Sequence, residues 1–333
     1  MLPNQEQYRT FFEQLQNCKD LDLRDKRGLR HEMSLILVAI ILSLLSNRDG
    51  NLSSIHRYMK NHQDRLLIFL KMSPKKVVSR AQLPLILERV NLPIFEALLL
   101  KNYGVHLTPT ERKWFAIDGK SLRGSIEKNS KLGEAIVLGV SHQGGMVHGQ
   151  EFYSGLKESE ITVVRNLLTN KHLSEQNINL DALHCTPNTL SQIHQASGIY
   201  LVGLKLNQPE LFEDCTDTIR FCQATYNFTH DQREKPKHGR KELRKYQVYD
   251  ISKDEKHKRW KDCNISTLIK VERDITEVKS NVISSETSLY ISNQTENYQQ
   301  LCEAIRGHWT VETGNYIRDV TFKEDDFKTK KKT

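Results

Sequence analysis

The chain has 333 residues, of which 38% are hydrophobic and 27% are charged, so it can form one large or two ordinary domains and is too apolar for wholesale disorder. Its 49 Lys and Arg residues outnumber its 41 Asp and Glu residues, and the resulting charge of +8 favours a polyanionic partner. The six cysteines form no Cys-x-x-Cys pair, which argues against a zinc ribbon or a disulfide framework and favours the reducing cytoplasm. The first residues lack the basic and apolar segments of a signal peptide.

The first third of the chain, residues 1–105, is predicted to be an all-helical domain. Helical spacing of apolar residues predicts helices over 5–17, 31–46, 51–60, 60–70, 79–90 and 92–101. The apolar run from Met33 to Leu45 is shorter than the roughly 20 residues that cross a bilayer, so we expect a buried core helix and no membrane association. DNA binding and simple packing are the two alternatives for this domain.

From Arg112 the pattern changes to strands that alternate with helices. A strand over Trp114–Asp118 is followed by a hairpin whose strands, 135–142 and 146–153, are joined by Gln143-Gly-Gly. The elements expected next are a helix over 160–169, a strand over 178–182, a helix over 187–196, a strand over 200–205 and a helix over 209–222. This order predicts a mixed α/β sheet with an antiparallel edge, compatible with a ribonuclease-H-like core.

Residues 225–287 interrupt this alternation and are predicted to form a separate β-rich insertion with strands over 245–251 and 265–271. Between Arg233 and Lys261 there are twelve Lys or Arg residues against five Asp or Glu residues. This excess favours a surface that faces phosphates, with a solvated loop as the alternative. After the insertion, a short strand over 289–292 and a helix over 296–312 are expected.

Three acidic residues stand out. Asp118 and Asp181 each end a predicted core strand, and Glu312 lies one helical turn after His308. A single acidic residue at the end of a strand is more often a turn former than a ligand. Three carboxylates on rigid elements, however, could hold two metal ions about 3.5–4 Å apart for phosphoryl transfer. The cations that could hold the phosphate beside them are Lys120, Arg123, Lys205 and Arg306.

Several motifs resemble those of the DDE transposases of the H-repeat-associated (ISAs-like) insertion sequences, over almost the whole chain. The stretch from Ala116 to Ser125, Ala-Ile-Asp-Gly-Lys-Ser-Leu-Arg-Gly-Ser, resembles the first-aspartate motif of this family. Further similar segments are Asp181-Ala-Leu-His, Lys157 to Ile161, Lys205 to Pro209, His238 to Arg244, Arg306 to Glu312, Asp319 to Asp325, and Arg24 to His31 before the apolar helix. The last of these resembles the transposase-associated domain of the family.

The resemblance implies a ribonuclease-H-like catalytic domain over 106–333 and a transposase that cleaves and joins DNA at the ends of a mobile element. Asp118, Asp181 and Glu312 would be the catalytic residues and the ligands of Mg²⁺, for which Mn²⁺ could substitute. The residues implied to contact DNA are Lys120, Arg123, Lys205, Arg240, Lys241, Arg244, Arg306 and His308. Double-stranded DNA would be the partner, in the bacterial cytosol at the nucleoid, with a homodimer as one alternative for the assembly.

The spacer after Glu312 is about one residue shorter than in the family, and the family continues with a further apolar helical segment beyond the final lysines. We therefore expect a chain that is truncated at its C-terminus. An inactive remnant that only binds DNA is one alternative function, and a host ribonuclease or repair nuclease is another. A zinc site formed by His142, His148, His184 and Cys185 is disfavoured because their spacing matches no standard zinc pattern.

Overall fold

The computed structural model describes residues 5–25, 27, 29–46, 49–73, 75–104, 107, 111–126, 130, 132–155, 157–234, 239–254 and 258–326. The chain forms two compact units, which are treated separately below. One unit contains residues 1–106, 122–133 and 314–333, and the other contains residues 107–121 and 134–313. The basic tail after residue 326 and His238 of the basic insertion lie outside the described residues.

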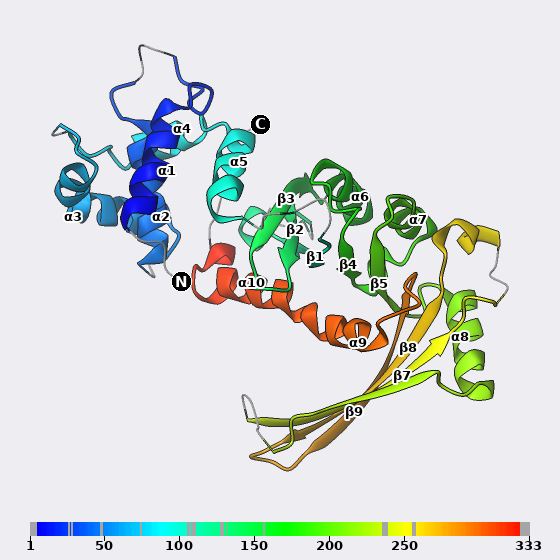
Figure 1. Ribbon diagram of the computed structural model, residues 1–333. Helices are drawn as coiled ribbons and strands as arrows, with labels where there is room; N and C mark the ends of the chain where they lie inside the picture. Colours follow the sequence, from blue (N-terminus) through cyan, green and yellow to red (C-terminus); the bar gives the residue numbers. More distant parts are fainter. Residues whose placement is uncertain are drawn as a thin grey trace. The chain divides into compact units, whose positions relative to one another are not determined.

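The first unit is built from the helices at the start of the chain (Figure 1). They are α1 (Gln5–Asn17), α2 (Met33–Leu45), α3 (Leu52–Phe69), α4 (Gln82–Leu87) and α5 (Leu92–Tyr103). Seven residues in succession are buried in α2, as expected of a helix that is apolar on nearly all sides and lies within a core. Helix α3 is continuous, where the sequence predicted two helices. Among the described residues, no helix is long and apolar enough to cross a membrane.

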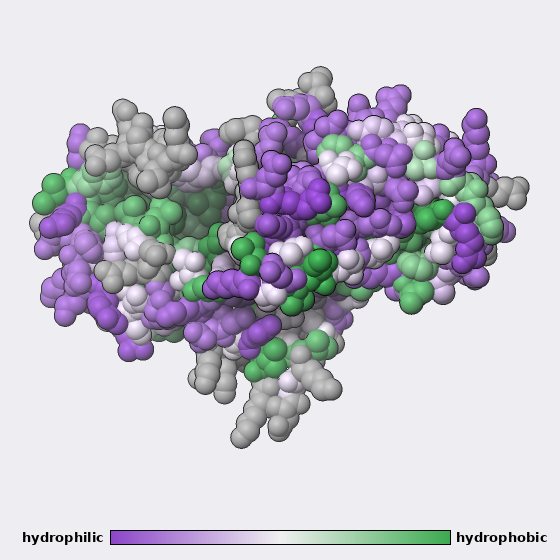
Figure 2. Space-filling model, turned by 90° about the horizontal axis from the view of Figure 1, so that it is seen from below, coloured by the Kyte–Doolittle hydropathy of each residue, from purple (hydrophilic) through white to green (hydrophobic). Residues whose placement is uncertain are grey.

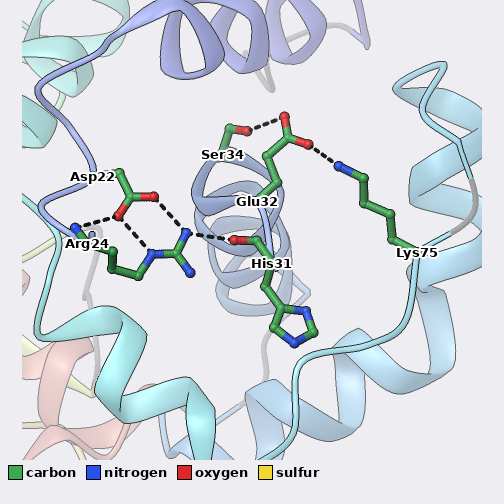
Figure 3. Close-up of polar contacts among 6 residues, drawn as sticks. All are labelled: Asp22, Arg24, His31, Glu32, Ser34 and Lys75. Carbon is green, nitrogen blue, oxygen red and sulfur yellow. Dashed lines mark hydrogen bonds and ion pairs between the residues drawn. The ribbon is translucent and has the colours of Figure 1, made fainter. Parts of the chain in front are cut away.

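Polar contacts fix the charged connector that precedes α2 (Figure 3). The guanidinium of Arg24 donates two hydrogen bonds to the Asp22 carboxylate, at 2.8 and 2.6 Å, and a third to the His31 carbonyl at 2.7 Å. Glu32, the residue before α2, accepts a hydrogen bond from Lys75 Nζ at 2.6 Å. These hydrogen bonds fix the segment of the chain that leads into α2.

The second unit contains a nine-stranded mixed sheet in the order β3-β2-β1-β4-β5-β9-β8-β7-β6. Its strands, in chain order, are β1 (Trp114–Ser121), β2 (Glu134–Ser141), β3 (Val147–Ser154), β4 (Asn177–Leu180), β5 (Ile199–Leu204), β6 (Tyr226–Asp231), β7 (Arg240–Asp250), β8 (Thr267–Glu277) and β9 (Ile283–Ser292). Strands β1, β4 and β5 are parallel to one another, and every other pair of neighbours is antiparallel. The predicted mixed α/β architecture is therefore confirmed.

Helices lie on both faces of the sheet (Figure 1). They are α6 (Glu160–Asn170), α7 (Pro187–Gln195), α8 (Pro209–Phe221), α9 (Tyr298–Gly307) and α10 (Trp309–Val320), which continues past Thr313 into the first unit. Apolar residues of α9 pack with Leu201 of β5 and with residues of β7 and β8. Helices α6 and α7 are the crossover helices that precede β4 and β5.

Strand β6 was not predicted, and three other details of this unit differ from the sequence prediction. Strand β1 does not end at Asp118 but continues to Ser121, because β2 pairs with it as far as Ser121↔Ala135. The strands of the basic insertion form no separate sheet; β9 pairs with β5, so β6–β9 extend the central sheet. The last predicted helix is two helices, α9 and α10, which meet at His308.

The surface drawn in Figure 2 is mainly hydrophilic, with smaller hydrophobic patches between the polar residues. Large apolar side chains that remain exposed in the second unit include Leu206 and Phe221. Single exposed apolar residues are normal on protein surfaces and carry no functional argument by themselves.

Candidate active site

The two aspartates occupy equivalent positions on neighbouring parallel strands. The last backbone pair between β1 and β4 is Ile117↔Leu180, so Asp118 and Asp181 are the next residue on each strand. Because side chains alternate along a strand, Asp118 and Asp181 lie on the same sheet face as Asn179 of β4. Asp181 Oδ1 also accepts a hydrogen bond from the Leu183 backbone at 2.9 Å, which caps the short 3-10 helix Ala182–His184.

Glu312 reaches this site because α9 is fixed on the same face of the sheet. The buried Asn179 side chain donates a hydrogen bond from Nδ2 to the Ala304 carbonyl of α9 at 2.6 Å. Helix α10 begins two residues after α9 ends and carries Glu312 in its first turn. This hydrogen bond and the apolar packing of α9 thus bring together Asn179 and Ala304, which are 125 residues apart in the sequence.

Carboxylates and cations line one cavity of about 360 Å³. Its lining includes all three predicted carboxylates, together with the predicted DNA-binding residues Lys205, Arg244 and His308, and the additional basic residue Arg273. The structure thus brings together six of the eleven residues that the sequence singled out. Negative groups from β1, β4 and α10 share this cavity with cations from β5, β7 and β8.

The charges in the cavity change the acidity of Asp118. Burial, and then the nearby carboxylates of Glu160, Asp181 and Glu312, raise the pKa of Asp118 to about 6. Partial burial likewise raises the pKa of Glu312, against the opposing effect of the Arg273 guanidinium. Burial lowers the pKa of His308, so the imidazole is favoured in its neutral form. The carboxylates near Asp118 therefore repel one another, and a bound cation would relieve this repulsion.

Known proteins with similar sequences include several whose names are those of putative transposases. The chain is 30% identical over 223 residues to the "Putative transposase YncI" of Escherichia coli O157:H7, which covers 65% of this chain and 56% of that protein. It is 28% identical over 222 residues to the "H repeat-associated putative transposase YhhI" of Escherichia coli strain K12, covering 65% of this chain and 58% of that protein. The chain is a relative of the H-repeat-associated transposases.

The family resemblance predicted from the motifs is thereby confirmed. The chain spans somewhat more than half the length of the relatives that it matches. No family model matches the chain.

The other basic residues implied by the family resemblance lie outside the cavity. Arg240 and Lys241 are exposed at the start of β7, and Lys120 lies on β1 beyond Asp118. Arg306 donates one hydrogen bond to His230, on β6, and one to Gln232, the residue after β6, at 3.1 Å. Arg123 belongs to the first unit, where its side chain pairs with Asp325 at 3.6 Å.

Arg244 and Arg273 form an ion-pair network on the cavity wall. The Glu242 carboxylate accepts hydrogen bonds from Arg244 Nε and, at 2.7 Å, from Arg273 Nε. Arg273 also pairs with Glu286 at 3.0 Å and lies over the Trp309 ring, with its guanidinium carbon 5.6 Å from the centroid. Arg244 is only 6% exposed, so its predicted contact with DNA would have to be made inside the cavity. Arg273 was not predicted, because no motif marks an arginine in the middle of a strand.

Glu160 and His184 are two further residues that sequence reasoning did not assign to the site. Glu160 begins α6 and is a close neighbour of Asp118, as its effect on the aspartate shows. His184 Nε2 lies 3.2 Å from Glu160 Oε1 and 3.7 Å from Asp181 Oδ1. In the sequence, the signal for Glu160 was the segment Lys157 to Ile161. This segment resembles a family motif, but the motif gives no role for Glu160.

The four residues considered for zinc have other neighbours. The His142 ring stacks on Trp114 with centroids 5.9 Å apart, and the His148 ring lies against Phe115 at 5.4 Å. Cys185 is buried, which raises the pKa of its thiol to about 12. Across the part of the chain that the structure describes, no three His, Cys, Asp or Glu residues form a ready-made metal site.

Proposed function

We propose that the chain is a DDE-type transposase that uses Asp118, Asp181 and Glu312, with divalent cations, to cleave DNA and transfer its strands. The observation that carries this proposal is the placement of two aspartates at equivalent positions on adjacent parallel strands, in a cavity that Glu312 also lines. The order β3-β2-β1-β4-β5, with β1, β4 and β5 parallel, supports the further proposal that this half of the sheet is ribonuclease-H-like.

The donor chemistry of the cavity fits a hard divalent cation. Mg²⁺ and Mn²⁺ prefer carboxylate oxygens, and these three residues supply only such donors. Burial and then repulsion from the neighbouring carboxylates raise the pKa of Asp118, and a bound cation would relieve that repulsion. Since no three acidic groups among the described residues form a ready-made site, we expect small side-chain movements to accompany binding. When bound, the cation would polarise a phosphoryl oxygen and activate the attacking water or 3′-hydroxyl.

The chain's own residues would position the DNA. Lys205 and Arg273 line the same cavity as the carboxylates and can bind the non-bridging phosphate oxygens. Glu242 and Glu286 hold the Arg273 guanidinium in place, which reduces the entropy lost when a phosphate binds. Arg240 and Lys241, exposed on β7, are proposed to contact the DNA backbone outside the cavity.

Cleavage of a supercoiled plasmid that carries the gene for this chain with its native flanking DNA tests the proposal. With Mg²⁺ we expect nicked and joined products, and with EDTA or with Asp118→Asn we expect none. Glu303→Gln, on the exposed surface of α9, is the matched control and should cleave as the wild type does. Plasmid binding without any cleavage by the wild type would contradict the proposed activity and favour a DNA-binding remnant.

A further inference from the structure

Three side chains contact one another close to the two aspartates. Tyr153 of β3 donates a hydrogen bond to Glu160 Oε2 at 3.2 Å, and His184 Nε2 lies 3.2 Å from Glu160 Oε1. Because an ionised carboxylate only accepts hydrogen bonds, this contact requires the proton of His184 to be on Nε2. The His184 side chain is 1% exposed, and Tyr153 is also buried. These three residues, Tyr153, Glu160 and His184, are called the clamp below.

The clamp contacts the backbone next to Asp118. A Cβ atom added to Gly119 would lie 2.3 Å from both Cδ and Oε2 of Glu160, so the Glu160 carboxylate occupies the space that any side chain at 119 would need. Gly119 has an ordinary strand conformation, so its backbone does not require glycine. Its lack of a side chain instead allows the Glu160 carboxylate to approach the strand closely. Alternation along β1 directs position 119 to the sheet face opposite that of Asp118.

The other end of the clamp contacts the second aspartate. His184 Nε2 is 3.7 Å from Asp181 Oδ1, within the same short turn. Backbone pairing between β1 and β4 ends at Ile117↔Leu180, so no backbone ladder between these two strands spans the pair of aspartates. The clamp therefore connects the two strands where the ladder stops, from Gly119 through Glu160 and His184 to Asp181.

We propose that Glu160 and His184 are positioning residues that hold Asp118 and Asp181 at the separation at which both carboxylates bind one divalent cation. This inference rests on the proposed function, because it assigns a role only if the aspartates bind a cation. Residues that orient metal ligands are typically worth about 10–100-fold in metal affinity.

Titration of the full chain with Mn²⁺, with free Mn²⁺ followed by electron paramagnetic resonance, tests the inference. Glu160→Ala removes the clamp and should weaken Mn²⁺ binding by about 10–100-fold. Glu160→Gln keeps the hydrogen-bond acceptor for His184 and the shape of the side chain, so its affinity should stay close to that of the wild type. Asp118→Asn, which removes a proposed ligand, should abolish tight binding.

A second variant tests the clamp without altering its members. Gly119→Ala must displace the Glu160 carboxylate and should weaken Mn²⁺ binding as Glu160→Ala does. Gly149→Ala on β3 is the matched control, because its Cβ would meet the side chains of Lys171 and Leu167 and no member of the clamp, and it should bind Mn²⁺ normally. Circular dichroism of each variant confirms that the affinity is measured on folded protein.

The outcomes separate this inference from the proposed function. If Asp118→Asn loses Mn²⁺ while Glu160→Ala and Gly119→Ala bind it normally, the clamp has no positioning role. If Glu160→Gln is as weak as Glu160→Ala, Glu160 acts through its charge or as a ligand, and the positioning role is again refuted. If the wild type binds Mn²⁺ no more tightly than Asp118→Asn, the proposed function fails together with the inference.

Discussion

Replacing Asp118 by Asn is predicted to stabilise the cation-free chain. In the folded chain the pKa of Asp118 is about 6, whereas the ordinary value is 3.8, so ionising this group opposes folding. At 1.36 kcal/mol per pKa unit, the penalty above pH 6 is about 3 kcal/mol. Asn has nearly the same shape without the charge, and we therefore expect Asp118→Asn to raise the free energy of unfolding by up to about this amount.

The pH dependence of the effect follows from the same two pKa values. Below pH 3.8 Asp118 is protonated in both the folded and the unfolded chain, so wild type and Asp118→Asn should be equally stable. As the pH rises from 3.8, the unfolded chain loses the proton first and the wild type is progressively destabilised. The difference between the two proteins should reach its maximum above pH 6 and then remain constant.

Urea denaturation in EDTA, followed by circular dichroism at pH 4 and pH 7.5, measures this difference. Asp214→Asn, on the exposed surface of α8, controls for the substitution itself and should leave stability within about 0.5 kcal/mol. Adding Mg²⁺ should stabilise the wild type and have little effect on Asp118→Asn, because only the folded wild type offers the complete site. A wild type that is as stable as Asp118→Asn at pH 7.5 without cations would refute the reasoning.

Three further predictions concern the elements around the site. Gly307→Ala would place a Cβ atom 2.1 Å from the His142 ring and should destabilise the chain by about 1–3 kcal/mol in urea titrations, with His142→Ala partly relieving this cost in the double variant. Asn179→Ala should cost about 1–3 kcal/mol and increase amide hydrogen exchange in α9, because it leaves a buried carbonyl unpaired. Neutralising Arg240 and Lys241 should weaken DNA binding, and if each contacts one phosphate the slope of log affinity against log salt should fall by about 2. Unchanged stability, exchange or salt slope, respectively, would contradict each prediction.

Local sequence patterns predicted most of the elements but not their limits. The apolar run of α2 and the Gly-Gly hairpin between β2 and β3 are determined by neighbouring residues, so they could be predicted directly. The first strand was predicted to end at Asp118, yet Gly119 continues β1 because β2 pairs with it. Strand β6 was missed, and the extension of the sheet through β9 depends on pairing with β5, which is a long-range contact.

The site shows the same division between local and long-range information. The position at strand ends singled out Asp118 and Asp181 in the sequence, and the parallel pairing of β1 with β4 brings them to one edge of the sheet. Family motifs, rather than periodicity, indicated Glu312, which reaches the cavity only through the docking of α9. Glu160 was not predicted, because its contact with Gly119 joins an α6 residue to a strand that lies 41 residues earlier in the sequence.

The energetics of the cavity connect its structure with its proposed chemistry. A single buried carboxylate could offset the free-energy cost of its burial by accepting hydrogen bonds. Asp118, however, also lies near the negative charges of Glu160, Asp181 and Glu312. Such an arrangement opposes folding unless a cation compensates for it, which is the usual balance between stability and activity at functional sites. The Glu160–His184 contact limits this cost by giving one of the four carboxylates its own hydrogen-bond donor. The carboxylates of Asp181 and Glu312 still repel Asp118, and binding of a cation would relieve that repulsion.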